Sequence, residues 1–440
     1  MSATKVRVIG GGLAGCEASR RLARAGVETE LFEMKPVRFS PAHRSPYLAE
    51  LVCSNSFRSA DPGSAVGLLK EEMRIMGSVI MSAAEKTRVP AGKALAVDRE
   101  GFAAAVTAEI EALDRVKVIR EEVTELDPEQ LTVLSTGPLT SEDLSRGLAA
   151  LVGEEHLYFY DAIAPIVTAD SIDMEAVFFG SRYGLPGQGD YLNCPLTKEE
   201  YLAFYEALMA APKVRPRDFE EPKYFEGCLP IEVMAQRGPM TLAFGPMKPV
   251  GLEEPRTGRR PFAVVQLRRE NQAGTLYNLV GFQTRLKHQE QEKVLRLIPG
   301  LKRAEFVRLG SVHRNTFLHA PAHLTRYLQL REATAIFIGG QLSGVEGYVE
   351  SAAMGILAGE NAARAAAGRP LVSPPPTTAV GALVAHLTDQ TPRKFQPSNV
   401  NFGLMPPPPE KLGKKERPVF MARRALSDLK AWIEEVEYES

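Results

Sequence analysis

The residues with the clearest chemical meaning near the start of the chain are three glycines, spaced as Gly10-x-Gly12-x-x-Gly15. Residues 6–9 have the pattern of a buried strand, and small apolar residues recur after the glycines at helical spacing. A strand, a glycine turn and a helix present backbone N–H groups and a helix N-terminus to a pyrophosphate. Gly10 permits the turn, Gly12 lets a phosphate approach, and Gly15 lets helix and strand pack closely.

An acidic residue follows at the distance that such a site requires. Residues 29–33 have the pattern of a second strand and end in Glu33, about 20 residues past the glycines. A carboxylate at this position meets a ribose 2′-hydroxyl. The alternative, a glycine turn that binds nothing, is disfavoured by the complete strand–helix–strand context. The sequence therefore predicts a bound dinucleotide.

The other chemically notable side chains are four thiols, at positions 16, 53, 194 and 228. They are too few and too scattered for a disulfide framework, and none forms the C-x-x-C pair of a zinc site, so we expect no metal. We expect a cytoplasmic protein whose thiols are free for chemistry. Most free cysteines are buried apolar fillers, and this interpretation fits Cys16 and Cys194.

The elements that must position these residues can be followed along the chain. Helical patterning is predicted for 65–80 and for 98–113, with Asp98 as an N-cap, and strands are predicted for 116–123 and 131–137. From about Tyr158 the strands become short and Pro, Gly and aromatic residues frequent, which indicates an α+β insertion domain. A buried strand at 333–340, ending in glycines, and a small-residue helix at 349–367 favour a return to the first domain.

This pattern divides the chain into four segments. We predict the first part of a dinucleotide-binding domain, an insertion domain for substrate, a return segment, and a C-terminal extension with an amphipathic packing helix. Their predicted ranges are 1–160, 161–330, 331–372 and 373–440.

Composition and charge narrow the function classes. The chain has 440 residues, 44% of them hydrophobic, and no apolar run approaches the ~18 residues of a membrane span. Its start leads directly into a strand, so we expect neither a signal peptide nor a membrane anchor. The net charge is −1, but residues 213–331 hold 21 Lys and Arg against 11 Asp and Glu. This asymmetry predicts a polyanionic partner, and a solvated basic face is the equally weighted alternative.

No second G-x-G-x-x-G motif with a strand and a helix around it is present, so FAD fits better than a resident nicotinamide. A first domain that is interrupted by a long insertion and closed by a late strand–glycine–helix is typical of the flavoproteins related to glutathione reductase. The fold class that we predict is α/β, a Rossmann-like FAD-binding domain of this class with an α+β insertion domain.

Longer motifs resemble one family along essentially the whole chain. It is the bacterial folate-dependent, FADH2-oxidising tRNA (uracil-5-)-methyltransferases. The motifs that carry the resemblance are GGGLAGCEA at 10–18, AELVCSNS at 49–56, GPMKPVGL at 245–252, GFQT at 281–284, IPGL at 298–301, HRNT at 313–316 and GQLSGVEGY at 340–348.

The resemblance implies a one-carbon transfer to C5 of a uridine, which in this family is uridine 54 of the tRNA T loop. The carbon would come from 5,10-methylenetetrahydrofolate and the electrons from reduced FAD, and NAD(P)H would reload the flavin. This chemistry calls for a thiol and a base. The resemblance assigns Cys228 as the thiol that adds to uracil C6 and Cys53 as the group that protects or deprotonates C5.

Further site residues follow from the same resemblance. We expect His313 to stack on the pterin, with Arg314 and Asn315 at the folate or a phosphate, and Tyr348 to lie against the isoalloxazine ring. The FAD contacts that we expect are Gly10, Gly11, Gly12, Leu13, Ala14, Gly15, Glu33, Val123, Gly340, Gln341 and Tyr348. The phosphate contacts that we expect for tRNA are Arg256, Arg259, Arg260, Arg268 and Arg269, with Lys302 and Arg303 behind them.

Three alternatives stay open at this point. The same chemistry could act on a ribosomal RNA uridine, since nothing in the residues names the RNA. The chain could be a flavin oxidoreductase for a small acidic substrate. It could also be a flavoprotein that binds tRNA without chemistry.

Overall fold

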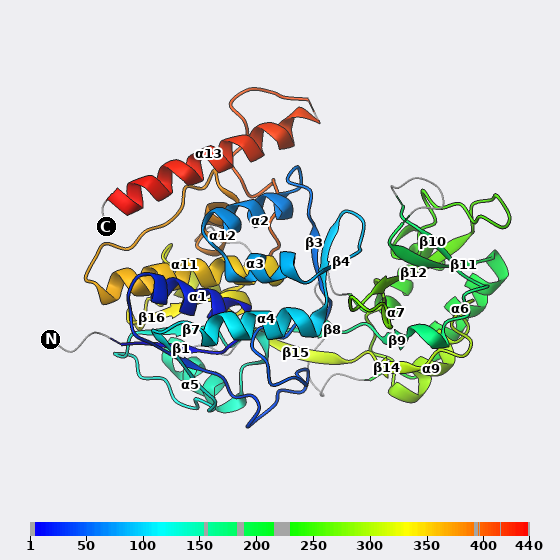
Figure 1. The fold of residues 1–440 in the computed structure, drawn as a ribbon, viewed down its shortest axis with the longest axis horizontal. Coiled ribbons are helices and arrows are strands. Elements are labelled where there is room, and N and C mark those ends of the chain that lie inside the picture. Colours follow the sequence, from blue (N-terminus) through cyan, green and yellow to red (C-terminus); the bar gives the residue numbers. More distant parts are fainter. Residues whose placement is uncertain are drawn as a thin grey trace.

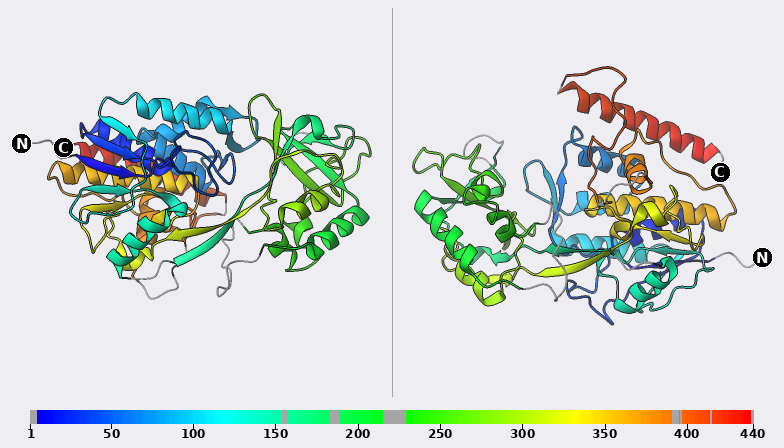
Figure 2. Two further views of the ribbon diagram at one scale, coloured as in Figure 1. Left: turned by 90° about the horizontal axis from the view of Figure 1, so that it is seen from below. Right: turned by 180° about the vertical axis from the view of Figure 1, so that it is seen from behind.

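The structure is a computed structural model that describes residues 5–153, 157–182, 189–214, 229–390, 395, 397–413 and 415–438, with backbone alone at 157–162, 312–315 and 437–438. It consists of a larger body, which holds both termini, and a smaller one formed by the middle of the chain (Figure 1). Strands β8 (Leu157–Ala162) and β15 (Val312–Phe317) pair antiparallel and run between the two bodies (Figure 2).

The core of the larger body is a five-stranded parallel sheet in the order β16-β7-β1-β2-β6. Val6 and Val8 of β1 are fully buried because helices cover the sheet, and β16, with the sequence Ile-Phe-Ile, is buried along its whole length. This confirms the predicted α/β fold and places the late strand β16 beside β7. The five strands are β1 (Val6–Ile9), β2 (Thr29–Phe32), β6 (Val116–Ile119), β7 (Thr132–Leu134) and β16 (Ile336–Ile338).

Two helices cross closely above this sheet, α1 (Leu13–Arg24) and α11 (Tyr348–Ala366). A Cβ on Gly355 of α11 would overlap backbone atoms of Ala14, and one on Gly359 would lie 2.6 Å from the Cα of Ala18. Glycines at these positions let the two backbones touch, so the two glycine-rich ends of the dinucleotide site are held together by helix packing.

One predicted helix is wrong in extent. The pattern at 65–80 corresponds to two helices, α2 (Ala65–Ile75) and the start of α3 (Val79–Lys86). Gly77 separates them with a φ of +77°, a conformation that glycine adopts without strain. Apolar periodicity continues across the break because both helices bury one face in the same core, and this concealed the boundary. Asp98 is confirmed as the N-cap of α4 (Arg99–Glu111), accepting from the Gly101 N–H at 2.9 Å.

The smaller body is built on a six-stranded sheet in the order β10-β11-β12-β13-β9-β14, antiparallel throughout. Buried apolar residues of these strands and of four helices form a core separate from that of the larger body. The elements are β9 (Ile166–Thr168), β10 (Phe178–Gly180), β11 (Tyr191–Leu196), β12 (Ala263–Arg269), β13 (Leu276–Leu279), β14 (Phe306–Arg308), α6 (Lys198–Ala210), α7 (Ile231–Ala235), α8 (Thr241–Phe244) and α9 (His288–Leu295).

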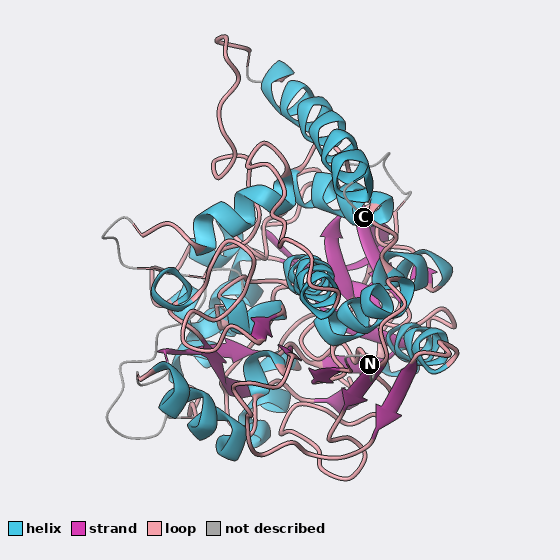
Figure 3. Cartoon of the chain, turned by 90° about the vertical axis from the view of Figure 1, so that its left-hand side faces the viewer, coloured by secondary structure: helices cyan, strands magenta, loops and turns pink. Residues whose placement is uncertain are grey.

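The remaining elements cover the larger body. The long C-terminal helix runs along the outside of the molecule (Figure 3). No helix among the described residues is long and apolar enough to cross a membrane. These elements are β3 (Ser56–Ser59), β4 (Arg88–Val89), β5 (Ala94–Val97), α5 (Glu142–Val152), α10 (Ala320–His323), α12 (Ala379–Leu387) and α13 (Glu416–Tyr438).

Two buried carboxylates tie helix N-termini into the larger body. Glu17 accepts from the N–H groups of Val79 and Ile80 at the start of α3, and Glu72 accepts from those of Ala379 and Val380 at the start of α12. Burial is the largest influence on both and outweighs these hydrogen bonds, so it raises the pKa of each carboxyl to about 7.

This environment predicts a pH-dependent stability. Because both pKa values are raised above the ordinary 4.5, the folded protein binds protons more tightly than the unfolded chain between pH 4.5 and 7. The stability that these protons contribute is present below pH 4.5 and is lost as the pH rises to 7. We expect Glu17→Gln to remove on the order of 3 kcal/mol of this dependence, measured by urea unfolding at pH 5 and pH 7.5. Stability curves of the two proteins that stay parallel across this range would contradict the expectation.

Candidate active site

An open cleft lies at the carboxyl ends of the parallel strands, with about 1070 Å³ of empty space when the adjoining solvent is included, and the glycine turn lines it. Gly10 has a φ of +102°, and a Cβ there would lie 2.6 Å from the carbonyl oxygen of Ser135. Gly12, the N-cap of α1, has no atom within 4 Å of its Cβ position and gives the helix no side-chain cap. The open N–H groups at this helix start leave room for an anionic group, so the residues fit a bound pyrophosphate.

Glu33 stands directly after β2 and is buried. Its Oε2 accepts from the Gly11 N–H at 2.9 Å and its Oε1 from the Lys35 N–H at 3.0 Å. Each oxygen keeps a second lone pair, so the carboxylate is held rigidly at the cleft and can still accept from ribose hydroxyls.

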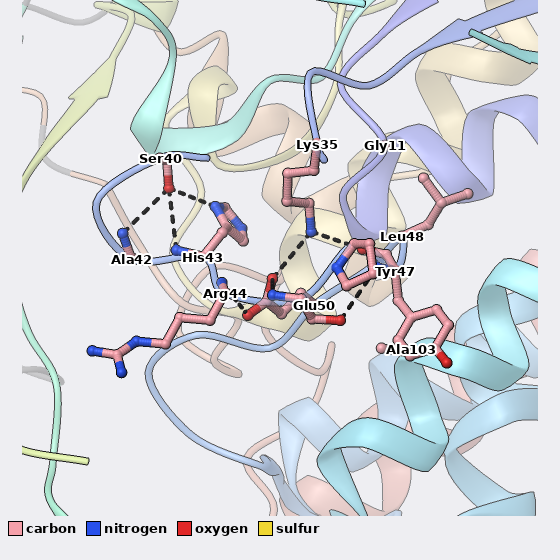
Figure 4. A network of polar contacts seen from close by, with 12 residues as sticks. Gly11, Lys35, Ser40, Ala42, His43, Arg44, Tyr47, Leu48, Glu50 and Ala103 are labelled. Atoms are coloured by element: carbon pink, nitrogen blue, oxygen red, sulfur yellow. Dashed lines mark hydrogen bonds and ion pairs between the residues drawn. The ribbon is translucent and has the colours of Figure 1, made fainter. Parts of the chain in front are cut away.

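The loop after Glu33 contributes residues that the sequence did not single out. Glu50 accepts from the N–H of Arg44, the N–H of Ser45 and the ammonium group of Lys35, at 2.9, 3.1 and 3.1 Å (Figure 4). Lys35 also donates to the Tyr47 carbonyl at 2.7 Å. This buried ion pair folds the loop over the cleft, and Glu50 lines the cleft itself.

His43, in the same loop, also lines the cleft. Its Nδ1 lies 2.6 Å from the Ser40 hydroxyl, which fixes the ring (Figure 4). The sequence signal for His43 was its place among several prolines in the irregular segment after Glu33, but its spacing from Glu33 matches no known motif.

The predicted cofactor residues come together in this cleft. Its lining includes Gly10, Gly11, Gly12, Leu13, Ala14, Glu33, Val123, Gly340, Gln341 and Tyr348. Gly15 lies beneath the turn, where a Cβ would overlap the Gly10 carbonyl oxygen. Gly340 has a φ of +76° and begins the turn that brings α11 to the cleft.

Tyr348, the first residue of α11, joins the cleft to a thiol. Its hydroxyl oxygen lies 2.9 Å from the Cys53 Sγ and accepts from the N–H groups of Cys53 and Ser54 at 2.9 and 3.3 Å. Burial first, and then Cys53, raises the pKa of Tyr348 well above its ordinary value of 10, so the phenol keeps its proton.

The hydrogen-bond partners of Tyr348 restrict how its hydroxyl meets Cys53. A phenol oxygen has two lone pairs and one hydrogen. The two backbone N–H groups occupy both lone pairs, so the hydrogen of the phenol is left to face the sulfur. A donor in this position stabilises negative charge on the sulfur.

Arginines surround this thiol at the junction of the two bodies. Arg268, at the end of β12, is buried and donates to the Asn55 side chain and the Ser54 hydroxyl, both at 2.9 Å. Burial, followed by repulsion from Arg99, lowers the pKa of Arg308 to about 10. The segment that carries Cys53 thus contacts a buried arginine of the smaller body.

Several predicted residues cannot be placed in the site in this way. Cys228 lies outside the described residues. For His313, Arg314 and Asn315 the structure describes only the backbone, in β15, where it pairs with 159–161 of β8. Cys16 and Cys194 are buried, as predicted for filler residues. No group of three or more His, Cys, Asp or Glu side chains in the described part of the chain could hold a metal ion.

The predicted RNA-binding arginines separate into two environments. Arg256 is exposed and pairs with Glu254 at 2.6 Å, and Arg259 and Arg260 are exposed. Arg268 is buried, and its hydrogen bonds to Ser54 and Asn55 give it a structural position.

Comparisons with known proteins agree with this geometry. The family model described as glucose inhibited division protein A matches residues 5–370. A methylenetetrahydrofolate–tRNA-(uracil-5-)-methyltransferase TrmFO of Geobacter sulfurreducens is 58% identical over 97% of this chain and 98% of its own length. One of Oleidesulfovibrio alaskensis is 57% identical over 98% of this chain and 97% of its own.

Among solved structures, Aquifex aeolicus GidA aligns with a TM-score of 0.71 at 18% identity, over 97% of this chain and 73% of that one. This likeness supports the fold alone, a Rossmann-like α/β fold of the flavoprotein type. The end-to-end identity to curated relatives is far more specific. The chain belongs to the family of methylenetetrahydrofolate–tRNA-(uracil-5-)-methyltransferases, within the larger family of glucose inhibited division protein A.

Proposed function

We propose that the protein methylates C5 of a tRNA uridine, position 54 of the T loop, with 5,10-methylenetetrahydrofolate as the carbon donor. Reduced FAD, when bound in the cleft, supplies the two electrons and the hydrogen that turn the methylene into a methyl group, and NAD(P)H reduces it again. The names of the relatives support the folate and tRNA parts of this proposal, and the family and the cleft support FAD.

The observation that carries the proposal is the contact between Cys53 and Tyr348. Tyr348 lines the dinucleotide cleft, and its hydroxyl lies 2.9 Å from the Cys53 sulfur. A thiol thus stands beside Tyr348, at the edge of the cleft that would hold the cofactor. A flavoprotein that only transfers hydride would not need such a thiol.

The chemistry explains why thiols are needed. Uracil C5 is a poor nucleophile, and addition of a thiolate to C6 converts the ring to an enolate that attacks the electrophilic methylene carbon. The new C5–C bond forms as the first of the two C–N bonds that hold the methylene to folate breaks. Loss of the C5 proton lets the second C–N bond break, which releases tetrahydrofolate and leaves an exocyclic methylene on C5. This carbon takes up the hydride equivalent, and the C6–S bond then breaks and returns the thiolate. We assign the C6 addition to Cys228 and the protection or deprotonation of C5 to Cys53.

The remaining roles follow the same proposal. His313 and Asn315 would bind folate, and both lie on β15, which runs between the two bodies. The exposed Arg256, Arg259 and Arg260, with Arg269, would neutralise tRNA phosphates and make binding dependent on salt. A uridine stacked in a folded loop must be flipped out to reach a thiol.

Transfer of label tests this function. The purified holoenzyme, NADPH and methylene-labelled methylenetetrahydrofolate are incubated with a T-arm transcript, a ribosomal RNA fragment or no RNA, and the nucleosides are analysed. We expect label in 5-methyluridine from the T-arm transcript alone. Label in the ribosomal fragment instead would change the substrate. Consumption of NADPH without labelled nucleoside would favour a small-molecule oxidoreductase, and RNA binding without either would favour a scaffold.

A further inference from the structure

A partly buried arginine contacts the segment that carries Cys53. Arg99 is the first residue of α4, and its side chain is 16% exposed. Its Nη1 donates to the Leu51 carbonyl, two residues before Cys53, and its Nε donates to the Glu270 carboxylate. Arg99 therefore holds the backbone that positions the thiol.

The partner of Arg99 comes from the smaller body. Glu270 directly follows β12 and is 3% exposed, and its carbonyl accepts from the Arg99 N–H at 3.4 Å. The Asn55 side chain donates to the next carbonyl along, that of Arg269, at 3.0 Å. The end of β12 is thus fastened to both sides of the Cys53 segment, so Arg99 takes its position only when the two bodies are seated together.

The charge of Arg99 also acts on the thiol. Burial lowers the pKa of Arg99, but Glu270, and after it Tyr348 and Cys53, outweigh burial and leave the pKa raised. The guanidinium is therefore a permanent cation. The other charged groups near the Cys53–Tyr348 pair are Arg268 from β12, Arg308 from β14 and Glu270 itself.

We propose that Arg99 is a positioning residue for Cys53, which fixes the 51–53 segment and holds the sulfur in its thiolate form, and that Glu270 sets Arg99 in place. The Tyr348 hydroxyl lies 2.9 Å from the sulfur, and Arg99 adds a positive charge at the Leu51 carbonyl, two residues before it. The packing of the smaller body on the larger one is thereby coupled to activation of the Cys53 thiol. The catalytic role of Cys53 rests on the proposed function, but the reactivity of its sulfur does not.

Alkylation of Cys53 by iodoacetamide tests the proposal without turnover. The rate is followed from pH 5.5 to 9.5 on flavin-loaded protein, and the Cys53 peptide is identified by mass spectrometry. We expect Arg99→Gln to raise the midpoint of the rate–pH curve by about one pH unit, since a nearby opposite charge shifts a titration by ~1–3 units. At pH 7 this makes alkylation about 10-fold slower. Arg99→Lys should restore most of the rate.

A second variant, in which the carboxylate partner of Arg99 is neutralised, distinguishes an effect of charge from structural support. Glu270→Gln removes a negative charge from the same cluster, so we expect its midpoint to fall while that of Arg99→Gln rises. The control is Arg21→Gln, which breaks the Arg21–Glu360 pair between α1 and α11 and should leave the wild-type curve unchanged.

The outcomes separate charge from mere structural support. A structural role alone would move Arg99→Gln and Glu270→Gln in the same direction, and that result, or an unchanged Arg99→Gln curve, overturns the proposal. If Arg99→Gln does not fold, the midpoints of the Arg99→Lys and Glu270→Gln curves test the proposal in its place. A shift of both midpoints in the same direction overturns the proposal. Methyl transfer by a Cys53→Ala variant would overturn the function assigned to Cys53 and leave these curves intact.

Discussion

Replacing Cys53 with alanine is expected to lower methyl transfer at least ~1000-fold, while the protein keeps its flavin. The sulfur lies 2.9 Å from the Tyr348 hydroxyl at the edge of the cleft, and in the proposed reaction its removal takes away the group that protects or deprotonates C5. Loss of one member of a catalytic group acting as a unit commonly costs 10³-fold or more. The measurement is the rate of 5-methyluridine formation at saturating folate, together with the ratio of flavin to protein.

The matched control is Cys194→Ala, because Cys194 is fully buried in the core of the smaller body and far from this chemistry. It should keep most of the activity. Cys228→Ala should also abolish methylation and leave the protein yellow. A Cys53→Ala enzyme with more than a tenth of the wild-type rate would remove Cys53 from the reaction.

The second large effect is expected at Gly15. Replacing it with alanine would force a Cβ into the Gly10 carbonyl oxygen and to 2.7 Å from the Ser135 hydroxyl. The first of these atoms is backbone, so relief requires α1 to move away from β1. We expect a loss of more than about 4 kcal/mol in stability and no flavin-loaded protein, measured by thermal unfolding and by the absorbance of bound flavin.

Gly12 provides the matched control for this substitution. It lies three residues earlier, has a φ of −75°, and has no atom within 4 Å of its Cβ position. Gly12→Ala should therefore fold normally but bind flavin at least ~10-fold more weakly, because its methyl group occupies the space through which a phosphate approaches. Equal stability of the Gly15 and Gly12 variants would show that close packing at Gly15 is not required.

The features that the sequence predicted correctly depend on patterns of residues close together in the chain. The strand at 6–9, the glycine turn and Glu33 lie within about 30 residues and follow one strand–helix–strand unit, so spacing alone places them together. The late strand, observed as Ile336–Ile338, was recognisable because a strand buried on both faces is apolar and ends in glycines. Family resemblance supplied the thiols and the folate residues, which no local pattern identifies.

What the sequence could not predict depends on contacts between distant residues. Tyr348 and Cys53 are 295 residues apart, and the packing of the start of α11 on the 53–58 segment, with Tyr348 against Phe57 and Glu350 paired with Arg58, brings them together. Arg268 and Arg269 looked equivalent as a basic pair, yet β12 is buried as far as Arg268, and only its last residue, Arg269, is partly buried. The Arg99–Glu270 pair joins the two bodies, and neither residue belongs to a recognisable motif.

The central claim is that reduced flavin supplies the two electrons and the hydrogen that convert the transferred methylene into the methyl group of the uridine. It is tested most directly by carrying out the reaction in D₂O and measuring, by mass spectrometry, the deuterium content of the 5-methyluridine from a T-arm transcript. The hydrogen on the reduced flavin nitrogen exchanges with solvent, so this account predicts one deuterium in the methyl group and tetrahydrofolate as the other product. An undeuterated methyl group accompanied by dihydrofolate would show that folate itself is the reductant and would contradict the account.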